Sequence, residues 1–334
     1  MMTRGAASIE ATGLGGDTIH VGMCADNGFA LTLAAALTSI ARHADGGDRL
    51  TIYVIDGGLD PTARAKLGDV ARRCGPAVTV RWIEPDGSRL AGLRGMGRLP
   101  VASYLRLLLP EAVPDEVHKL IYLDGDLIVR SSLRPVWETD LNDCVLAAAA
   151  DRMTGAPPAE LLQAMGIDDW PYPYVNSGVM VIDLARWRRD GVADQMFEFI
   201  RRYNDQIRWA DQDAINGVLR GDIAPLPPEW NRQYLVMLEG DPDRRRSLWP
   251  GPPRELSSCR IVHFAGHKKP WEVGPYDADR REFIRSLYRS GYLPRRRVIG
   301  LWLRCVFDRV RVWRREVLGS NRQRRGVGLS EPSP

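Results

Sequence analysis

The chain has 334 residues, of which 44% are hydrophobic and 26% charged, a balance typical of folded globular proteins and not of disordered or fibrous chains. Its five cysteines lie far apart and form no CxxC pair, so the sequence indicates neither a disulfide framework nor a zinc site, and a reducing cytoplasm is expected. Residues 1–17 lack the apolar core of a signal peptide and are expected to form a flexible N-terminus, and no apolar run is long enough to span a membrane.

The N-terminal part alternates between strand-like and helix-like segments, separated by turn and cap residues. The expected strands are residues 18–25, 50–56, 78–83 and 120–123, and the expected helices are residues 29–43 and 61–74. This order predicts a parallel sheet with right-handed crossovers. The carboxyl ends of its strands would bring Asp26, Asp56 and Asp124 to one rim, where open α/β sheets bind ligands.

Asp124-Gly125-Asp126 is the most informative motif, because two carboxylates follow the apolar run that ends at Leu123. Carboxylate oxygens at a sheet rim suit a hard divalent cation, and such a cation can hold a diphosphate. The alternative is a solvated turn, since Asp and Gly both favour turns for local reasons.

Phosphate groups need another means of binding in this chain, because it has no GxGxxG after the first strand and no P-loop. A metal at the Asp124-Gly125-Asp126 motif, together with a cation such as Arg106, would supply it. The segment from His263 to Trp271 adds an imidazole and the ammonium groups of Lys268 and Lys269 within one loop. The alternative is that His263 makes hydrogen bonds within its own loop and binds no ligand.

The C-terminal region makes the protein basic, since residues 295–325 contain 11 arginines against two acidic residues. Apolar residues at helical spacing between residues 299 and 318 predict an amphipathic helix with two tryptophans. Such a helix suits the interface of an anionic membrane, and docking on its own domain is the alternative. No recognition motif accompanies the charge, so a nucleic-acid partner is not expected.

From about residue 19 to residue 271 the chain resembles the glycosyltransferase family 8 enzymes, which are retaining galactosyl- and glucosyltransferases of the lipooligosaccharide type. The motifs that carry the resemblance occur in the family's order. They are Ala25-Asp26-Asn27, Ser103–Arg106, Tyr122–Val129, Tyr174–Leu184, Asp211–Asn216 and His263–Trp271. The resemblance implies a GT-A-type α/β fold with a Rossmann-like mixed sheet, helices on both faces and a C-terminal amphipathic helical tail. The implied donor-binding half is residues 18–140, the acceptor half is residues 141–290, and the basic tail is residues 291–334.

The resemblance also implies roles for single residues of this chain. The metal, Mn²⁺ or Mg²⁺, would be held by Asp124, Asp126 and His263. The UDP-sugar would be bound by these carboxylates and by Ala25, Asp26, Asn27, Phe29, Arg106, Gly125, Gly266 and Lys269. The groups around the transferred sugar, and the catalytic candidates, would be Asn176, Asp211 and Gln212.

The expected function is therefore metal-dependent, retaining transfer of galactose or glucose from a UDP-sugar to a glycan or glycolipid hydroxyl, in cell-surface polysaccharide or lipopolysaccharide synthesis. Front-face attack and double displacement remain alternative mechanisms. The enzyme is expected at the cytoplasmic face of the membrane through residues 295–325, with no obligate protein partner. A nucleotidyltransferase that forms NDP-sugars and a non-enzymatic module that binds anionic membranes are the rival functions.

Two proline-rich segments are candidates for acceptor contacts. Residues 151–174 occupy the place of a substrate-dependent insertion, and residues 225–231 form a second rigid loop. Trp170, Tyr172 and Trp230 are candidate sugar-stacking surfaces, with packing against their own loops as the alternative.

Overall fold

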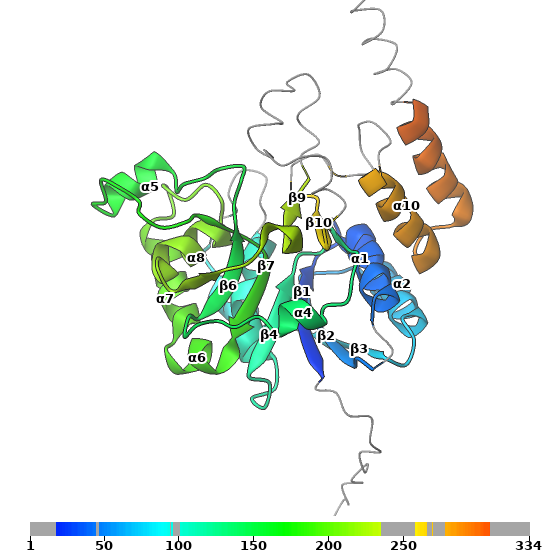
Figure 1. The fold of residues 1–334 in the computed structure, drawn as a ribbon, viewed down its shortest axis with the longest axis horizontal. Coiled ribbons are helices and arrows are strands. Elements are labelled where there is room, and N and C mark those ends of the chain that lie inside the picture. The colour runs from blue at the N-terminus through cyan, green and yellow to red at the C-terminus, as the bar shows by residue number, and fades with distance from the viewer. Residues whose placement is uncertain are drawn as a thin grey trace, which may run out of the picture.

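A computed structural model of the chain describes residues 18–44, 47–93, 95, 101–234, 258–265, 269 and 278–307. Its centre is a seven-stranded sheet of order β3-β2-β1-β4-β7-β6-β8 (Figure 1). The strands are β1 (Ile19–Ala25), β2 (Leu50–Asp56), β3 (Val78–Ile83), β4 (Lys119–Leu123), β6 (Leu146–Ala150), β7 (Val175–Asp183) and β8 (Ile223–Pro225). The four strands expected from the sequence are confirmed to within one residue at each end.

Strand direction divides this sheet into two parts. The strands β1, β2, β3 and β4 are parallel, as the alternation of strands and helices predicted. The strand β7 runs antiparallel to both β4 and β6, so the sheet is mixed. The beginning of β7 therefore lies beside the end of β4, and a backbone hydrogen bond of 2.8 Å from Asp151 N to Tyr174 O closes the long segment between β6 and β7.

Helices cover both faces of the sheet (Figure 1). On one face, α1 (Ala30–Arg42) and α2 (Pro61–Arg73) bury Leu33, Leu37 and Leu67 against β1 and β2. Asp60 caps α2 by accepting a hydrogen bond from Ala63 N at 2.8 Å. The other face is covered by η2 (Val101–Leu108), α3 (Leu109–Ala112), α6 (Leu184–Arg189), α7 (Val192–Arg202) and α8 (Asp211–Leu219).

A smaller sheet lies beside the end of β4. It has the order β5-β10-β9 and consists of β5 (Leu127–Val129), β10 (Ile261–His263) and β9 (Arg232–Gln233). Because β10 pairs antiparallel with β5, it places His263 opposite Leu127, next to the turn that follows β4. The remaining short elements are η1 (Gly87–Leu90), α4 (Arg134–Trp137), α5 (Ala159–Ala164) and η3 (Pro228–Trp230).

The C-terminal helices pack against α1 and the smaller sheet. The helix α10 (Ala278–Ser290) is followed by a helix over residues 295–307, which buries Val298, Leu301 and Cys305 in the same apolar cluster as Phe283. The same helix exposes Ile299, Trp302, Leu303 and Phe307. The amphipathic helix predicted from residue 299 is thus present as far as residue 307, and the rest of that prediction lies outside the described residues. Within the described chain, no helix combines the length and the apolarity needed to span a bilayer.

Candidate active site

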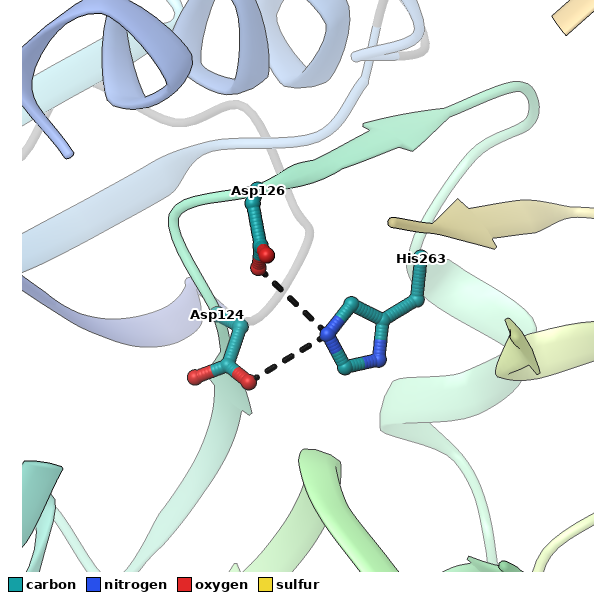
Figure 2. A group of neighbouring side chains, drawn as sticks. All are labelled: Asp124, Asp126 and His263. Carbon is teal, nitrogen blue, oxygen red and sulfur yellow. Dashed lines mark ion pairs between the residues drawn. The ribbon is translucent and has the colours of Figure 1, made fainter. Parts of the chain in front are cut away.

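The turn after β4 holds the carboxylate pair. Asp124 and Asp126 flank Gly125 between β4 and β5, and both carboxylates point to the same side of the turn (Figure 2). Their side chains are only 19% and 4% exposed, respectively. A carboxylate buried to this degree needs a cationic partner, so the solvated-turn alternative is wrong.

His263 completes a group of three potential metal ligands. Its Nε2 atom lies 3.4 Å from Asp124 Oδ2 and 3.4 Å from Asp126 Oδ1, and ligand atoms of the three residues all lie within 4.8 Å of one another. Atoms bound at about 2.1 Å around one divalent cation are separated by roughly 3 to 4 Å. Two carboxylates and one imidazole, at this spacing, fit a cation such as Mn²⁺ or Mg²⁺.

Nearby charges control protonation in this group. Burial opposes protonation of His263, but Asp124 and Asp126 outweigh it and raise its pKa to about 9. Burial also opposes ionisation of Asp126, yet Lys269 and His263 hold the pKa of that carboxyl well below its usual range. Lys269 Nζ lies 2.5 Å from Asp126 Oδ2. The carboxylates are therefore charged, and His263 must release a proton before its Nε2 can bind a cation.

Gly178 makes room for this arrangement. It lies near the beginning of β7, and its carbonyl oxygen accepts a hydrogen bond of 2.9 Å from Asp124 N. A Cβ atom at this position would lie 2.1 Å from His263 Cε1 and 2.7 Å from Asp124 Oδ2. The three potential ligands can converge only because this residue has no side chain.

Arg106 joins the carboxylate pair to a third acid. Its Nη2 atom lies 3.0 Å from Asp124 Oδ1 and its Nε atom 3.1 Å from Asp211 Oδ2, while Nη1 donates to Ser177 O at 3.0 Å. Burial raises the pKa of Asp211 to about 6, against the opposing charge of Arg106. The guanidinium thus holds together one acid in the turn after β4 and one acid at the start of α8.

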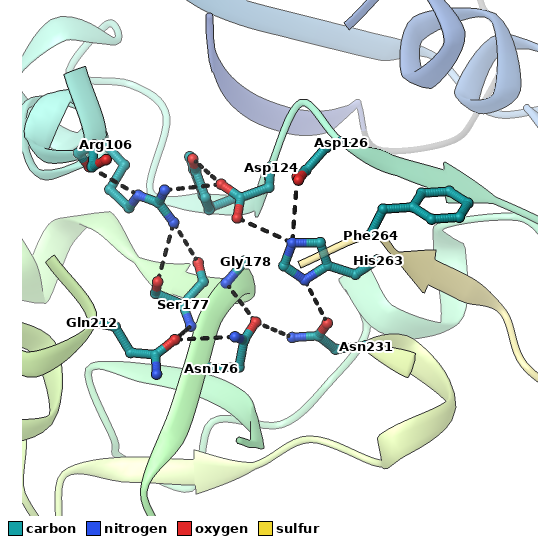
Figure 3. A network of polar contacts seen from close by, with 12 residues as sticks. Arg106, Asp124, Asp126, Asn176, Ser177, Gly178, Gln212, Asn231, His263 and Phe264 are labelled. Carbon is teal, nitrogen blue, oxygen red and sulfur yellow. Dashed lines mark hydrogen bonds and ion pairs between the residues drawn. The ribbon is translucent and has the colours of Figure 1, made fainter. Parts of the chain in front are cut away.

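A buried amide network continues from β7 into α8 (Figure 3). Asn176 Nδ2 donates to Gln212 Oε1 at 3.0 Å and to Asp151 Oδ2 at 3.2 Å. Gln212 Nε2 donates to the same Asp151 oxygen at 2.9 Å. The other Asp151 oxygen accepts hydrogen bonds from Met153 N and Thr154 N, so every polar atom of this group has a fixed direction.

These groups line one cleft of about 430 Å³, a size suited to a small-molecule ligand. The predicted site residues that line it are Ala25, Asp26, Phe29, Arg106, Asp124, Gly125, Asp126, Asn176, Asp211, Gln212, His263 and Lys269. One predicted residue, Asn27, does not line the cleft, and one, Gly266, lies outside the described residues. Asn27 is exposed outside the lining, and its side-chain oxygen accepts a hydrogen bond of 2.8 Å from Asp60 N.

Several lining residues were not singled out from the sequence. They include Asp151, Met153, Thr154, Ser177 and Trp209. Asp151 follows the apolar strand β6 directly, which is the pattern that identified Asp124, so this signal could have found it.

The three candidate sugar-stacking residues lie outside the cleft, whereas Trp209 lines it. Trp170 packs edge-on against Tyr172 with ring centroids 5.6 Å apart, and Trp230 is 5% exposed within the core. None of the three lines this cleft, and Tyr172 is exposed at the surface.

Comparison with known proteins identifies the family to which this site belongs. Residues 20–273 match the model described as Glycosyl transferase family 8. The chain belongs to this family. This family 8 chain is 28% identical over 271 residues to general stress protein A of Bacillus subtilis (strain 168), which covers 80% of the chain and 92% of that protein. It is 23% identical over 275 residues to lipopolysaccharide 1,2-glucosyltransferase of Escherichia coli, with 81% of the chain and 78% of that protein covered.

Solved structures agree with this assignment. The crystal structure of galactosyltransferase LgtC in complex with donor and acceptor sugar analogs matches with a TM-score of 0.68 at 26% identity, covering 83% of this family 8 chain and 98% of that chain. The protein is therefore a glycosyltransferase with a GT-A-type fold, and its family implies a sugar-nucleotide donor. Neither the nucleotidyltransferase nor the non-enzymatic alternative is supported.

Proposed function

We propose that this protein is a metal-dependent, retaining hexosyltransferase that moves galactose or glucose from a UDP-sugar to a glycan or glycolipid hydroxyl in cell-surface polysaccharide or lipopolysaccharide synthesis. The observation that carries this proposal is the joining of two subsites in one cleft. Asp124, Asp126 and His263 converge and form what we call the cation-binding end of the cleft. Arg106, which contacts both Asp124 and Asp211, connects this group to Asp211 and the Asn176–Gln212 pair, which we call the hydroxyl-binding end. A sugar diphosphate needs this combination of a cation-binding end and a hydroxyl-binding end.

The cation-binding end would hold the diphosphate. When bound, Mn²⁺ (or Mg²⁺) supplies positive charge that neutralises the diphosphate as a leaving group. The Lys269 ammonium lies 2.5 Å from Asp126 and 5.3 Å from the centroid of the Phe29 ring. It would therefore lie between the diphosphate and the nucleoside of a bound donor. The Gly266 backbone is proposed as a further phosphate contact.

The nucleoside would occupy the cleft beside the end of β1. Ala25, Asp26 and Phe29 line this part, and the Phe29 ring offers a flat apolar face for a base. Asn27 is proposed to approach the nucleoside from the rim, although its side-chain oxygen accepts from Asp60 N.

The transferred sugar would lie among polar side chains whose atoms have fixed directions. Asn176, Asp211 and Gln212 are proposed to hold its hydroxyl groups, with Arg106 orienting Asp211. In the reaction the bond from the anomeric carbon to the phosphate oxygen breaks, the acceptor oxygen bonds to that carbon, and a departing phosphate oxygen takes the acceptor proton. Double displacement would require covalent attack by Gln212 or Asp211. Both amide atoms of Gln212 make hydrogen bonds and Asp211 is paired with Arg106, which favours the front-face route.

A hydrolysis panel tests the donor proposal. We expect Mn²⁺-dependent release of UDP from UDP-galactose or UDP-glucose, with a rate at least about 100-fold lower in Asp126→Ala. Asp169→Ala, at an exposed acid outside the cleft, serves as the matched control and should keep the wild-type rate. Equal UDP release in EDTA and in Mn²⁺ would overturn the metal dependence, and absence of UDP binding would overturn the donor.

We further propose that residues 295–325 hold the enzyme at the cytoplasmic face of an anionic membrane. The helix over residues 295–307 supports this, because Ile299 is 48%, Trp302 39% and Phe307 64% exposed. Arg295, Arg296, Arg297 and Arg304 are exposed on the same helix. An apolar strip among arginines matches a lipid surface that carries phosphates.

Substitution on the exposed side of the helix tests this anchor more sharply than truncation, which would also remove Val298 and Leu301 from the core. The double variant Trp302→Glu and Phe307→Glu should lose binding to phosphatidylglycerol vesicles and keep UDP-sugar hydrolysis. Tyr172→Glu, at an exposed aromatic elsewhere, is the control. Unchanged vesicle binding in the double variant would refute the anchor.

A further inference from the structure

Asn231 makes contact with the imidazole nitrogen of His263 that faces away from the carboxylates. His263 Nδ1 lies 3.0 Å from Asn231 Oδ1, whereas Nε2 faces Asp124 and Asp126 (Figure 3). Asn231 is 3% exposed and directly follows η3. It also precedes β9, which pairs with β10 in parallel, so the backbones that carry Asn231 and His263 are held side by side.

Hydrogen bonds beyond Asn231 determine which way its amide points. The backbone N–H of Gly178 donates to Asn176 Oδ1 at 3.1 Å, so this atom of Asn176 must be an acceptor. The same oxygen lies 2.9 Å from Asn231 Nδ2, which donates to it. The oxygen of Asn231 is therefore the atom that faces His263, and an amide oxygen can only accept. It follows that Nδ1 of His263 carries the hydrogen.

We propose that Asn231 is a positioning residue that fixes the tautomer and orientation of His263, so that Nε2 offers its lone pair to a metal between Asp124 and Asp126. This inference rests on the proposed function. Histidine ligands in proteins are usually held in this way through their second nitrogen, and loss of such a partner typically lowers metal affinity 10- to 100-fold.

Asn231 also joins the cation-binding end of the cleft to the sugar-binding end. The oxygen of Asn176 accepts from Asn231, while the nitrogen of Asn176 donates to Gln212 and Asp151. A change in the amide of Asn231 thus alters the hydrogen bonds of Asn176, which lines the proposed sugar site, although Asn231 itself does not line the cleft. Any effect of metal binding on donor binding that is transmitted through this chain must be matched by an equal effect of donor binding on metal binding.

Two variants separate these effects. Asn231→Asp keeps an oxygen for the Nδ1–H of His263 but cannot donate to Asn176, whereas Asn231→Leu has a similar size and can do neither. We expect Mn²⁺ affinity, measured by electron paramagnetic resonance without any nucleotide, to fall 10- to 100-fold in Asn231→Leu and to stay at or above the wild-type value in Asn231→Asp. We expect Asn231→Asp to raise the KM for the hydrolysed UDP-sugar at saturating Mn²⁺.

Circular dichroism establishes that each variant is folded, and Asn204→Leu, outside the cleft lining, is the control. If folded Asn231→Leu binds Mn²⁺ as tightly as the wild type, or if Asn231→Asp loses Mn²⁺ as severely as Asn231→Leu, the proposal is wrong. An unchanged KM in Asn231→Asp refutes the link to the sugar end. Failure of the wild type itself to bind Mn²⁺ would instead overturn the proposed metal dependence.

Discussion

Replacement of Gly178 by alanine should remove the candidate metal site while leaving the sheet in place. The new methyl group would lie 2.1 Å from His263 Cε1, whereas carbon atoms in contact are separated by at least about 3.5 Å. The imidazole would have to move by about 1.4 Å, and metal–ligand distances tolerate changes of only about 0.2 Å. The variant should therefore lose His263 as a ligand.

The expected size follows from two separate effects. Loss of one ligand of three should weaken Mn²⁺ binding by at least about 100-fold, as measured by isothermal titration calorimetry. Crowding of the core should lower the free energy of unfolding by about 1 to 3 kcal/mol, as measured by urea denaturation. Both effects arise from the same contact, so they should appear together.

Gly300→Ala is the matched control for this substitution. Apart from its chain neighbours and the backbone of its own helix, no heavy atom of the described residues lies within 4 Å of the position that its Cβ would occupy. Gly300 lies inside the helix over residues 295–307. Alanine should stabilise that helix by up to about 1 kcal/mol and leave Mn²⁺ affinity unchanged. If Gly178→Ala binds Mn²⁺ within twofold of the wild-type affinity, the role given to this glycine is incorrect.

Three further predictions concern protonation, packing and metal loading. Burial raises the pKa of Asp211 to about 6. The contribution of this carboxyl group to stability is therefore complete below its unfolded pKa and is lost as pH rises through 6. In urea denaturation, Asp211→Asn should have a free energy of unfolding up to about 3 kcal/mol above that of the wild type at pH 7.5 but not at pH 4, and a difference independent of pH would contradict this. Arg188 donates hydrogen bonds to five backbone carbonyls between Pro110 and Val117. Arg188→Ala should therefore lower the free energy of unfolding by about 2 to 4 kcal/mol in the same assay. A decrease below about 0.5 kcal/mol would show that water replaces these bonds. Mn²⁺ at about 100 times its Kd should stabilise the protein by about 2.7 kcal/mol, reversibly with EDTA, and Asp124→Ala should not respond; a similar response in that variant would place the metal elsewhere.

The parallel half of the sheet could be predicted closely from the sequence. Buried parallel strands are short continuous apolar runs, and in this chain they are separated by clear caps such as Asp60-Pro61. The expected ranges 50–56 and 78–83 therefore coincide with β2 and β3 at both ends. The antiparallel position of β7 could not be deduced from such runs, because an apolar segment carries no information about direction.

Site residues were predictable where a motif surrounds them and not where tertiary packing alone brings them in. Asp124, Asp126 and His263 belong to motifs and do converge. Asn231 follows a proline-rich loop, and only the pairing of β9 with β10 places it beside His263. Asn27 belongs to a motif, yet its own backbone turn directs its oxygen to Asp60 N.

The C-terminal helix illustrates a further limit of sequence patterns. The spacing of apolar residues predicted one apolar face, with a membrane and self-docking as alternatives. The structure has two apolar sides on this helix, one buried through Val298, Leu301 and Cys305 and one exposed through Ile299 and Phe307. Periodicity cannot distinguish these sides, since both contain residues of the same type.

The closed segment between β6 and β7 has a consequence for divergence within the family. Its two ends are joined by the Asp151 N to Tyr174 O hydrogen bond and by the Ala150–Val175 pair of the sheet. Residues 155–173 can therefore be lengthened or exchanged without shifting Asn176, and each doubling of loop length costs only about 0.6 kcal/mol. Met153 and Thr154, which line the cleft, directly precede this segment, and their N–H groups hold the Asp151 carboxylate. A change in the segment would thus alter the surroundings of the cleft while leaving Asp124, Asp126 and His263 in place.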